Sequence, residues 1–140
     1  MKVHTFEHGR YLLVLERGED VLRSITSFAE KEDVGAASLQ GIGAADFVRL
    51  GQYDFTVKDY RVVELRGTLE VVSLIGNISL KDGRPFTHAH LIVTNREGQA
   101  FGGHLLEGST CSLTLEIEIK VLGAGLPRRV DPRFNLHVLY

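Results

Sequence analysis

Three histidines in two neighbouring segments have the clearest potential for chemistry in this sequence. His88 and His90 lie in PFTHAHLIV, residues 85–93, and His104 lies in FGGHLL, residues 101–106. Both segments are rich in residues that favour β-strands. In a strand, residues two apart point to the same face, so His88 and His90 share a face. Whether His104 joins them depends on how the two segments pair.

The residues between these segments, NREGQ, predict a tight β-hairpin. Gly98 takes the third position of a three-residue loop, where the left-handed conformation favours glycine. The residues flanking this loop then face each other, and counting outward from them places His90 directly across from His104. A β-bulge at the glycine pair before His104 would instead turn that side chain to the other face.

Three imidazoles on one face of a hairpin are typical of a metal site. Opposed Cβ atoms lie roughly 4.5 to 5.5 Å apart, which lets ring nitrogens reach one ion at about 2.0 to 2.1 Å. Three histidine ligands fit a Zn²⁺ site whose fourth position holds water or substrate, and imidazole also suits Ni, Cu, Fe and Co. The alternative is that the histidines make hydrogen bonds in a half-buried surface or contacts between subunits.

A catalytic metal site would also need a group that transfers protons. The other residues on the expected histidine face cannot do so: Phe86, Ile92, Ala100 and Leu106. A general acid or base would have to come from another strand or subunit, with Glu70, Glu116 and Glu118 as candidates. A carboxylate or an arginine near the open coordination position would favour an enzyme, whereas a closed apolar site would favour a binding role.

The elements that must position these histidines are mostly strands. One helix is predicted from about Asp20 to Lys31 by apolar residues at helical spacing, with Gly35 as its stop signal. The other segments favour strands and turns, over residues 11–16, 36–40, 44–53, 60–65, 67–80, 86–95, 99–106 and 112–121. Residues 123–133 are predicted to form an irregular arm, and residues 134–140 a final short strand. The fold class is α+β, a compact and mostly antiparallel sheet with one main helix.

Composition and charge narrow the classes of function. The chain of 140 residues is expected to form one domain, residues 1–140, with a core of its own. Its formal charge of −2 is far from the basic balance of a free-standing nucleic-acid binder. With one cysteine, no secretory leader and no membrane-spanning run, we expect a cytoplasmic protein that makes no membrane contact. Its basic cluster, Arg128, Arg129 and Arg133, favours a surface or subunit contact over a phosphate site.

Two long segments resemble the plants and prokaryotes conserved (PPC) domain. These are GEDVLRSITSFAEKEDVGAASLQGIGA and VVSLIGNISLKDGRPFTHAHLIVTNREGQAFGGHLLEG, and the HAH strand with GGHLLEG is the most specific part. The resemblance implies a homotrimer, and in plants the domain accompanies DNA-binding AT-hook segments. Similar single-domain prokaryotic members carry three histidines as a metal site, which corresponds to His88, His90 and His104. Plant members generally lack them. The family fold also resembles acetolactate decarboxylase, a zinc lyase.

Two hypotheses of function follow. The first is a homotrimeric metal-binding PPC-domain protein, with Zn²⁺ or another divalent transition metal and a DNA-binding or regulatory role that the family resemblance implies. The negative charge of the chain argues against tight DNA binding by this domain alone. The second is a zinc-dependent enzyme, a lyase or hydrolase, that acts on a small oxygen-rich molecule.

Overall fold

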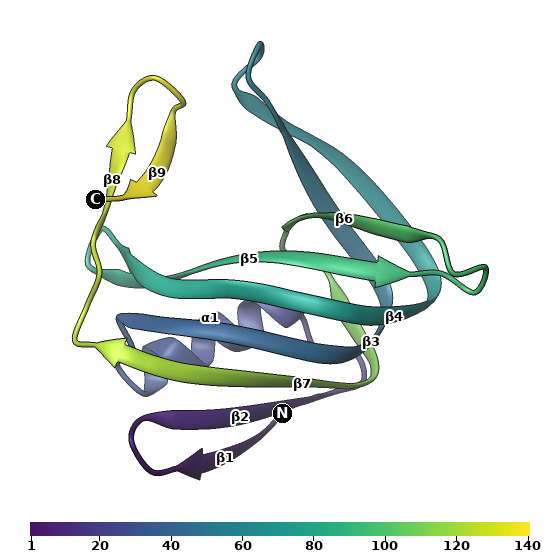
Figure 1. Cartoon of the computed structure of the whole chain (residues 1–140), viewed down its shortest axis with the longest axis horizontal. Helices are drawn as coiled ribbons and strands as arrows, with labels where there is room; N and C mark the ends of the chain where they lie inside the picture. Colours follow the sequence, from purple (N-terminus) through teal and green to yellow (C-terminus); the bar gives the residue numbers. More distant parts are fainter.

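The computed structural model describes all 140 residues as an antiparallel sheet of seven strands, a single helix and a small C-terminal hairpin (Figure 1). The strands of the large sheet lie in the order β1-β2-β7-β3-β4-β5-β6. Their bounds are β1 Lys2–Phe6, β2 Arg10–Glu16, β3 Ala36–Asp54, β4 Asp59–Lys81, β5 Arg84–Thr94, β6 Ala100–Leu105 and β7 Thr110–Gly123. Strands β8 (Arg128–Asp131) and β9 (Leu136–Leu139) form the second sheet. The predicted α+β class is confirmed.

Helix α1, Val21–Lys31, packs against one face of the sheet. The Asp20 side chain accepts a hydrogen bond from the backbone N–H of Arg23 and so caps the N-terminus. The apolar face predicted for it is Val21, Leu22, Ile25, Phe28 and Ala29; Leu22 is partly buried against the core, and the other four are buried. The C-terminal end of the helix differs from the prediction, because the residue with left-handed conformation after it is Asp33 rather than Gly35.

The two longest strands, β3 and β4, each join segments that the sequence pattern predicts as separate strands. Irregularities in register between Gly41 and Gly43 and between Ala45 and Phe47 bend β3 without ending it. The first part of β3 pairs with β7, and its far part pairs with β6 through Leu50–Leu105 and Gly51–His104. The sheet therefore curls, and β6 has a partner on both sides.

Side chains alternate between the two faces of the sheet along β5 and β7. On β5, Ala89, Leu91 and Val93 are buried, and the residues between them, including the histidines, lie on the opposite face, called the outer face below. On β7, apolar residues occupy the odd positions from Leu113 to Ile119, a pattern that predicts one covered face. Leu115 is buried accordingly, but Leu113 is 73% exposed. That odd position lies near the start of the strand, where the register with β3 shifts.

The C-terminal segment corrects the predicted irregular arm. Residues 128–131 form β8, which pairs with the predicted final strand, here β9. Backbone hydrogen bonds from Leu80 to Leu126 (2.8 Å) and from Leu126 to Gly35 (3.1 Å) fix the segment that leads into this hairpin. The first strand, β1, was not predicted from the sequence. The single helix is too short to cross a membrane.

Candidate metal centre

The hairpin of β5 and β6 has the register that the sequence predicts. Cα partners run from His90–His104 to Thr94–Ala100 without a shift, so no bulge turns His104 away. Gly98 has φ +74°, and the Asn95 backbone N–H donates to the Gln99 carbonyl (3.1 Å). The loop geometry therefore sets the histidine positions, as the glycine in NREGQ predicts.

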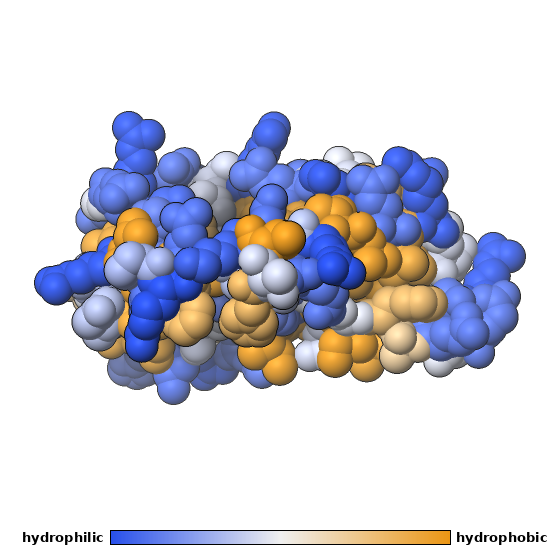
Figure 2. Space-filling view, turned by 90° about the horizontal axis from the view of Figure 1, so that it is seen from above, coloured by the Kyte–Doolittle hydropathy of each residue, from blue (hydrophilic) through white to orange (hydrophobic).

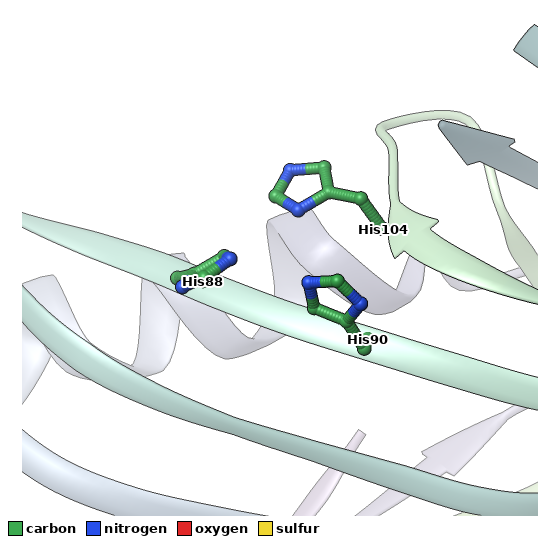
Figure 3. Close-up of side chains that lie close together, drawn as sticks. All are labelled: His88, His90 and His104. Atoms are coloured by element: carbon green, nitrogen blue, oxygen red, sulfur yellow. The ribbon is translucent and has the colours of Figure 1, made fainter. Parts of the chain in front are cut away.

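The three histidines converge on one point above the outer face (Figure 3). One ring nitrogen from each of His88, His90 and His104 lies within 4.8 Å of the other two. The ring centroids are 5.1 to 5.4 Å apart, so the rings do not stack tightly on each other. His104 Nδ1 is buried and has no hydrogen-bond partner within the chain. A buried nitrogen without a partner is costly, and a metal ion would use it.

The electrostatic environment favours the uncharged form of these histidines. Burial lowers the pKa of His104 to about 4, and the neighbouring His88, His90 and Arg128 act in the same direction. Burial also lowers the pKa of His88, with further contributions from Arg128 and His90. A neutral imidazole is the form that binds a metal. The fold therefore holds at least two of the three side chains in the ligand state near neutral pH.

An aromatic residue that sequence reasoning did not single out also touches the cluster. The Tyr60 ring of β4 stacks on the His104 ring, with centroids 4.9 Å apart. Gly51 on β3 leaves the space for it, because a Cβ at that position would lie 2.6 Å from Tyr60 Cδ1. A glycine in a strand is a signal of such a close approach. The sequence did not indicate which side chain would use the space.

Arg128, which the sequence assigned to a surface or subunit contact, reaches the same site. Its Nη2 lies 3.4 Å from His88 Nδ1 and donates to Asn77 Oδ1 (2.9 Å). The guanidinium lies beside a pocket that His88, His104 and Tyr60 also line. Pairing of β8 with β9 brings this residue back over the sheet, which the predicted irregular arm could not indicate.

The carboxylates considered as proton donors lie elsewhere. Glu118 accepts hydrogen bonds from Arg10 (3.1 Å) and Gln40 (2.9 Å). Glu70 and Glu116 line a different hollow, around Ile42. None of the three glutamates lines the pocket at the histidines, so the chain supplies an arginine there and no carboxylate.

Comparisons with known proteins agree with this picture. Residues 5–123 match the Plants and Prokaryotes Conserved (PCC) domain, the family abbreviated PPC above. The Bifunctional protein GlmU of Synechococcus sp. (strain JA-3-3Ab) is 32% identical over 91% of this chain. The AT-hook motif nuclear-localized protein 15 of Arabidopsis thaliana is 32% identical over 66% of the chain. This chain spans only 20% and 30% of the lengths of these two curated relatives.

Solved structures match over nearly the whole chain. A candidate DNA-binding protein of Ralstonia eutropha JMP134 is 36% identical, with a TM-score of 0.91 and coverage of 99% of this chain and 95% of its own. A metal-containing protein of Archaeoglobus fulgidus is 36% identical, with a TM-score of 0.85 and coverage of 100% and 99%. A Staphylococcus aureus protein similar to α-acetolactate decarboxylase shares the fold alone, at 11% identity, a TM-score of 0.58 and coverage of 86% and 64%. With its matched region, its paired histidine hairpin and these neighbours, the chain belongs to the Plants and Prokaryotes Conserved domain family.

Proposed function

We propose that this protein is a homotrimeric metal-binding protein in which His88, His90 and His104 hold one divalent transition metal ion. Zn²⁺ is the first candidate for this ion. The observation that carries the proposal is the convergence of three ring nitrogens within 4.8 Å of one another. The unpartnered Nδ1 of His104 supports it, because a ligand bond would satisfy that buried atom. The metal-containing Archaeoglobus fulgidus protein, at 36% identity, supports it independently.

Three protein ligands leave a coordination position open. In zinc sites of this kind the fourth position takes water or a substrate, and the ion acts as a Lewis acid there. The chain's own residues around the site limit what can approach. His88 and His104 border the pocket that also holds Arg128 and Tyr60, so a bound molecule would meet polar groups rather than a closed apolar wall.

The homotrimer part of the proposal is supported by the surface of the sheet. The apolar side chains of Ile42, Val72 and Ile75 are 53 to 63% exposed, and they lie on β3 and β4. Figure 2 shows apolar side chains gathered in patches among the polar ones on the side seen from above. Exposed apolar patches mark contact surfaces, and a second copy of this chain is the occupant that we propose.

For the biological role we propose a regulatory protein whose activity depends on the bound metal. We propose DNA as a partner only where the domain is part of a larger assembly. The Ralstonia eutropha and Arabidopsis thaliana relatives carry DNA-related descriptions, but the formal charge of −2 disfavours tight binding by this domain alone. A metal-dependent enzyme is the second candidate, and the arginine beside the site favours it. In that case His137, which lines the same pocket, is the candidate for proton transfer.

Metal content after reconstitution tests the first part of the proposal. Each of the six histidines is replaced by Ala, the protein is loaded with zinc and dialysed against a weak chelator, and zinc per subunit is measured. We expect about one ion in the wild type and in the His4, His8 and His137 variants, and strong loss in the His88, His90 and His104 variants. Equal retention in all six, or none in the wild type, would contradict the three-histidine site.

A further inference from the structure

Arg128 is a cation that the fold half buries without giving it an anionic partner. Its Nε donates to Ser79 Oγ (2.6 Å), and its Nη1 donates to the His137 carbonyl (2.9 Å). Its Nη2 donates to Asn77 Oδ1 (2.9 Å). All three acceptors are neutral, and burial lowers the pKa of Arg128. A charge taken out of water without an opposite charge destabilises a fold, so this placement calls for an explanation.

The other arginines of the chain are either paired with a carboxylate or exposed to solvent. Four of them form ion pairs with carboxylates: Arg10–Glu118, Arg49–Glu64, Arg61–Asp54 and Arg133–Asp131. Asp131 is the last residue of β8, so an acidic residue is close in sequence to Arg128, but it pairs with Arg133. The fold therefore holds Arg128 in a fixed position and leaves its charge uncompensated.

The guanidinium borders a pocket of about 310 Å³ at the histidine cluster. Its wall includes the side chains of Lys81 and Tyr60 and, from the C-terminal hairpin, residues 135–138. No aspartate or glutamate lines it. Lys81 forms no ion pair, and its Nζ lies 5.6 Å from the centroid of the Phe86 ring. The pocket therefore combines two positive side chains with two of the proposed metal ligands and has no acidic group.

The hydrogen-bonding capacity of Arg128 is not exhausted by the protein. Three of its five N–H groups donate to oxygen atoms of the chain. A fourth N–H group, on Nη2, donates to His88 Nδ1 (3.4 Å), because a guanidinium can only donate. The fifth has no acceptor within the chain. Charge-assisted bonds from arginine to carboxylate or phosphate oxygens are the strong ones, so an oxyanion suits the remaining capacity.

We propose that this pocket binds a small organic anion, with its carboxylate or phosphate group against Arg128 and Lys81 and its remaining polar atoms directed toward the three histidines. The last part rests on the proposed function, whereas the positive charge of the pocket does not depend on a metal. The volume is at the lower end of the range for small-molecule sites, roughly 300 to 1,000 Å³, which selects a compact ligand. The anion supplies the opposite charge that Arg128 lacks.

Calorimetric titration of the zinc-loaded protein tests this inference with three probes. Lactate carries a carboxylate, inorganic phosphate represents the phosphate group, and lactamide matches lactate in size without its charge. We expect binding of at least one anion and none of lactamide, and the tighter anion identifies the oxyanion class. The variants Arg128→Gln and Lys81→Gln are expected to bind that anion at least about tenfold more weakly, which is about 1.4 kcal/mol. Arg129→Gln is the matched control, because Arg129 lies over the Tyr140 ring and not in the pocket.

The outcomes separate this inference from the proposed function. Zinc content is measured on the same samples, and circular dichroism checks that the Arg128 variant folds. If it does not fold, the Lys81 variant decides. Wild-type protein that holds zinc but binds neither anion, or variants that bind as tightly as wild type, would overturn the anion pocket and leave the metal site standing. If the wild type holds no zinc, the proposed function fails, and titration of the metal-free protein with the same probes decides the anion pocket by itself.

Discussion

The phenol ring of Tyr60 lies stacked on the imidazole of His104, with ring centroids 4.9 Å apart and an interplanar angle of 24°. Tyr60 belongs to β4 and His104 to β6, two strands that do not pair with each other. Contact across the curled sheet therefore fixes the orientation of one histidine of the cluster. Gly51, the partner of His104 on β3, leaves the space that this contact needs.

Removal of this stacking contact is expected to weaken metal binding. Aromatic pairs contribute about 0.5 to 1.5 kcal/mol, so Tyr60→Ala should lower zinc affinity roughly two- to tenfold, as measured by competition with a chromophoric chelator. Gly51→Ala should have a similar effect, because its new Cβ would displace the Tyr60 ring. Tyr60→Phe keeps the ring and serves as the control. Unchanged affinity in the Ala variants would show that the stack does not orient His104.

The free energy of unfolding of the metal-free protein should fall in mild acid. In the folded state His104 stays neutral down to a pKa of about 4, whereas in the unfolded chain it takes a proton near pH 6.5. Between these values the unfolded state binds more protons, so lowering the pH from about 6.5 toward 4 favours unfolding. The lowered pKa of His88 acts in the same direction. Urea unfolding at several pH values measures this slope, and the His104→Gln variant should flatten it. An equal slope in wild type and variant would show that the pH dependence does not come from His104.

The apolar surface on β3 should control assembly. Ile42 is 61% exposed, and Ile42→Glu would place a charge in the contact that we propose between copies of the chain. Light scattering should give three times the mass of one chain for the wild type and a lower mass for this variant. Val57→Glu is the control, since Val57 is 65% exposed but lies in the β3–β4 turn. A monomeric wild type at micromolar concentration would refute the trimer.

Binding to random duplex DNA by the isolated chain should be weak. The formal charge is −2, four arginines are engaged with carboxylates, and Arg128 faces a pocket. We expect a Kd at physiological salt no tighter than the non-specific range, roughly 10⁻⁴ to 10⁻⁶ M. Titration of labelled duplex at two salt concentrations measures it. Nanomolar binding that resists salt would contradict the argument from charge.

Two leucines of β7 should differ sharply in their contribution to stability. Leu115 is fully buried, so Leu115→Ala should cost about 2 to 5 kcal/mol of unfolding free energy. Leu113 lies two residues earlier and is 73% exposed, and its replacement by Ala should cost less than about 0.5 kcal/mol in the monomer. Chemical denaturation measures both. Similar costs would mean that Leu113 is covered in the assembled protein.

The sequence predicted the histidine hairpin accurately because its determinants are local. A glycine at the third position of the loop sets the register, and strand alternation then determines which side chains share a face. The same reasoning located helix α1, whose apolar face repeats at helical spacing. It failed at Leu113, because an irregular register with a neighbouring strand changed the exposure of a residue that fits the alternation.

What the sequence could not predict depends on contacts between distant segments. Tyr60 meets His104 because the sheet curls. The glycines Gly41 and Gly43 favour a strand bend, and one register irregularity of β3 lies between them, but they do not indicate which distant strands the bend brings together. Arg128 reaches His88 across 40 positions of the chain because a short hairpin folds back over the sheet. Local pattern indicates that a segment is extended, but it does not indicate which part of the protein that segment will cover.

The hairpin of β8 and β9 lies outside residues 5–123, the region that matches the family, whereas all three histidines lie inside it. The two parts of the site thus come from different segments of the chain. Replacement of the last seventeen residues would exchange five of the ten residues that line the pocket, Arg128 and residues 135–138, and leave the sequence of the histidine hairpin unchanged. Grafting of a different tail could therefore change the lining of the pocket without any change in the segment that carries the three histidines.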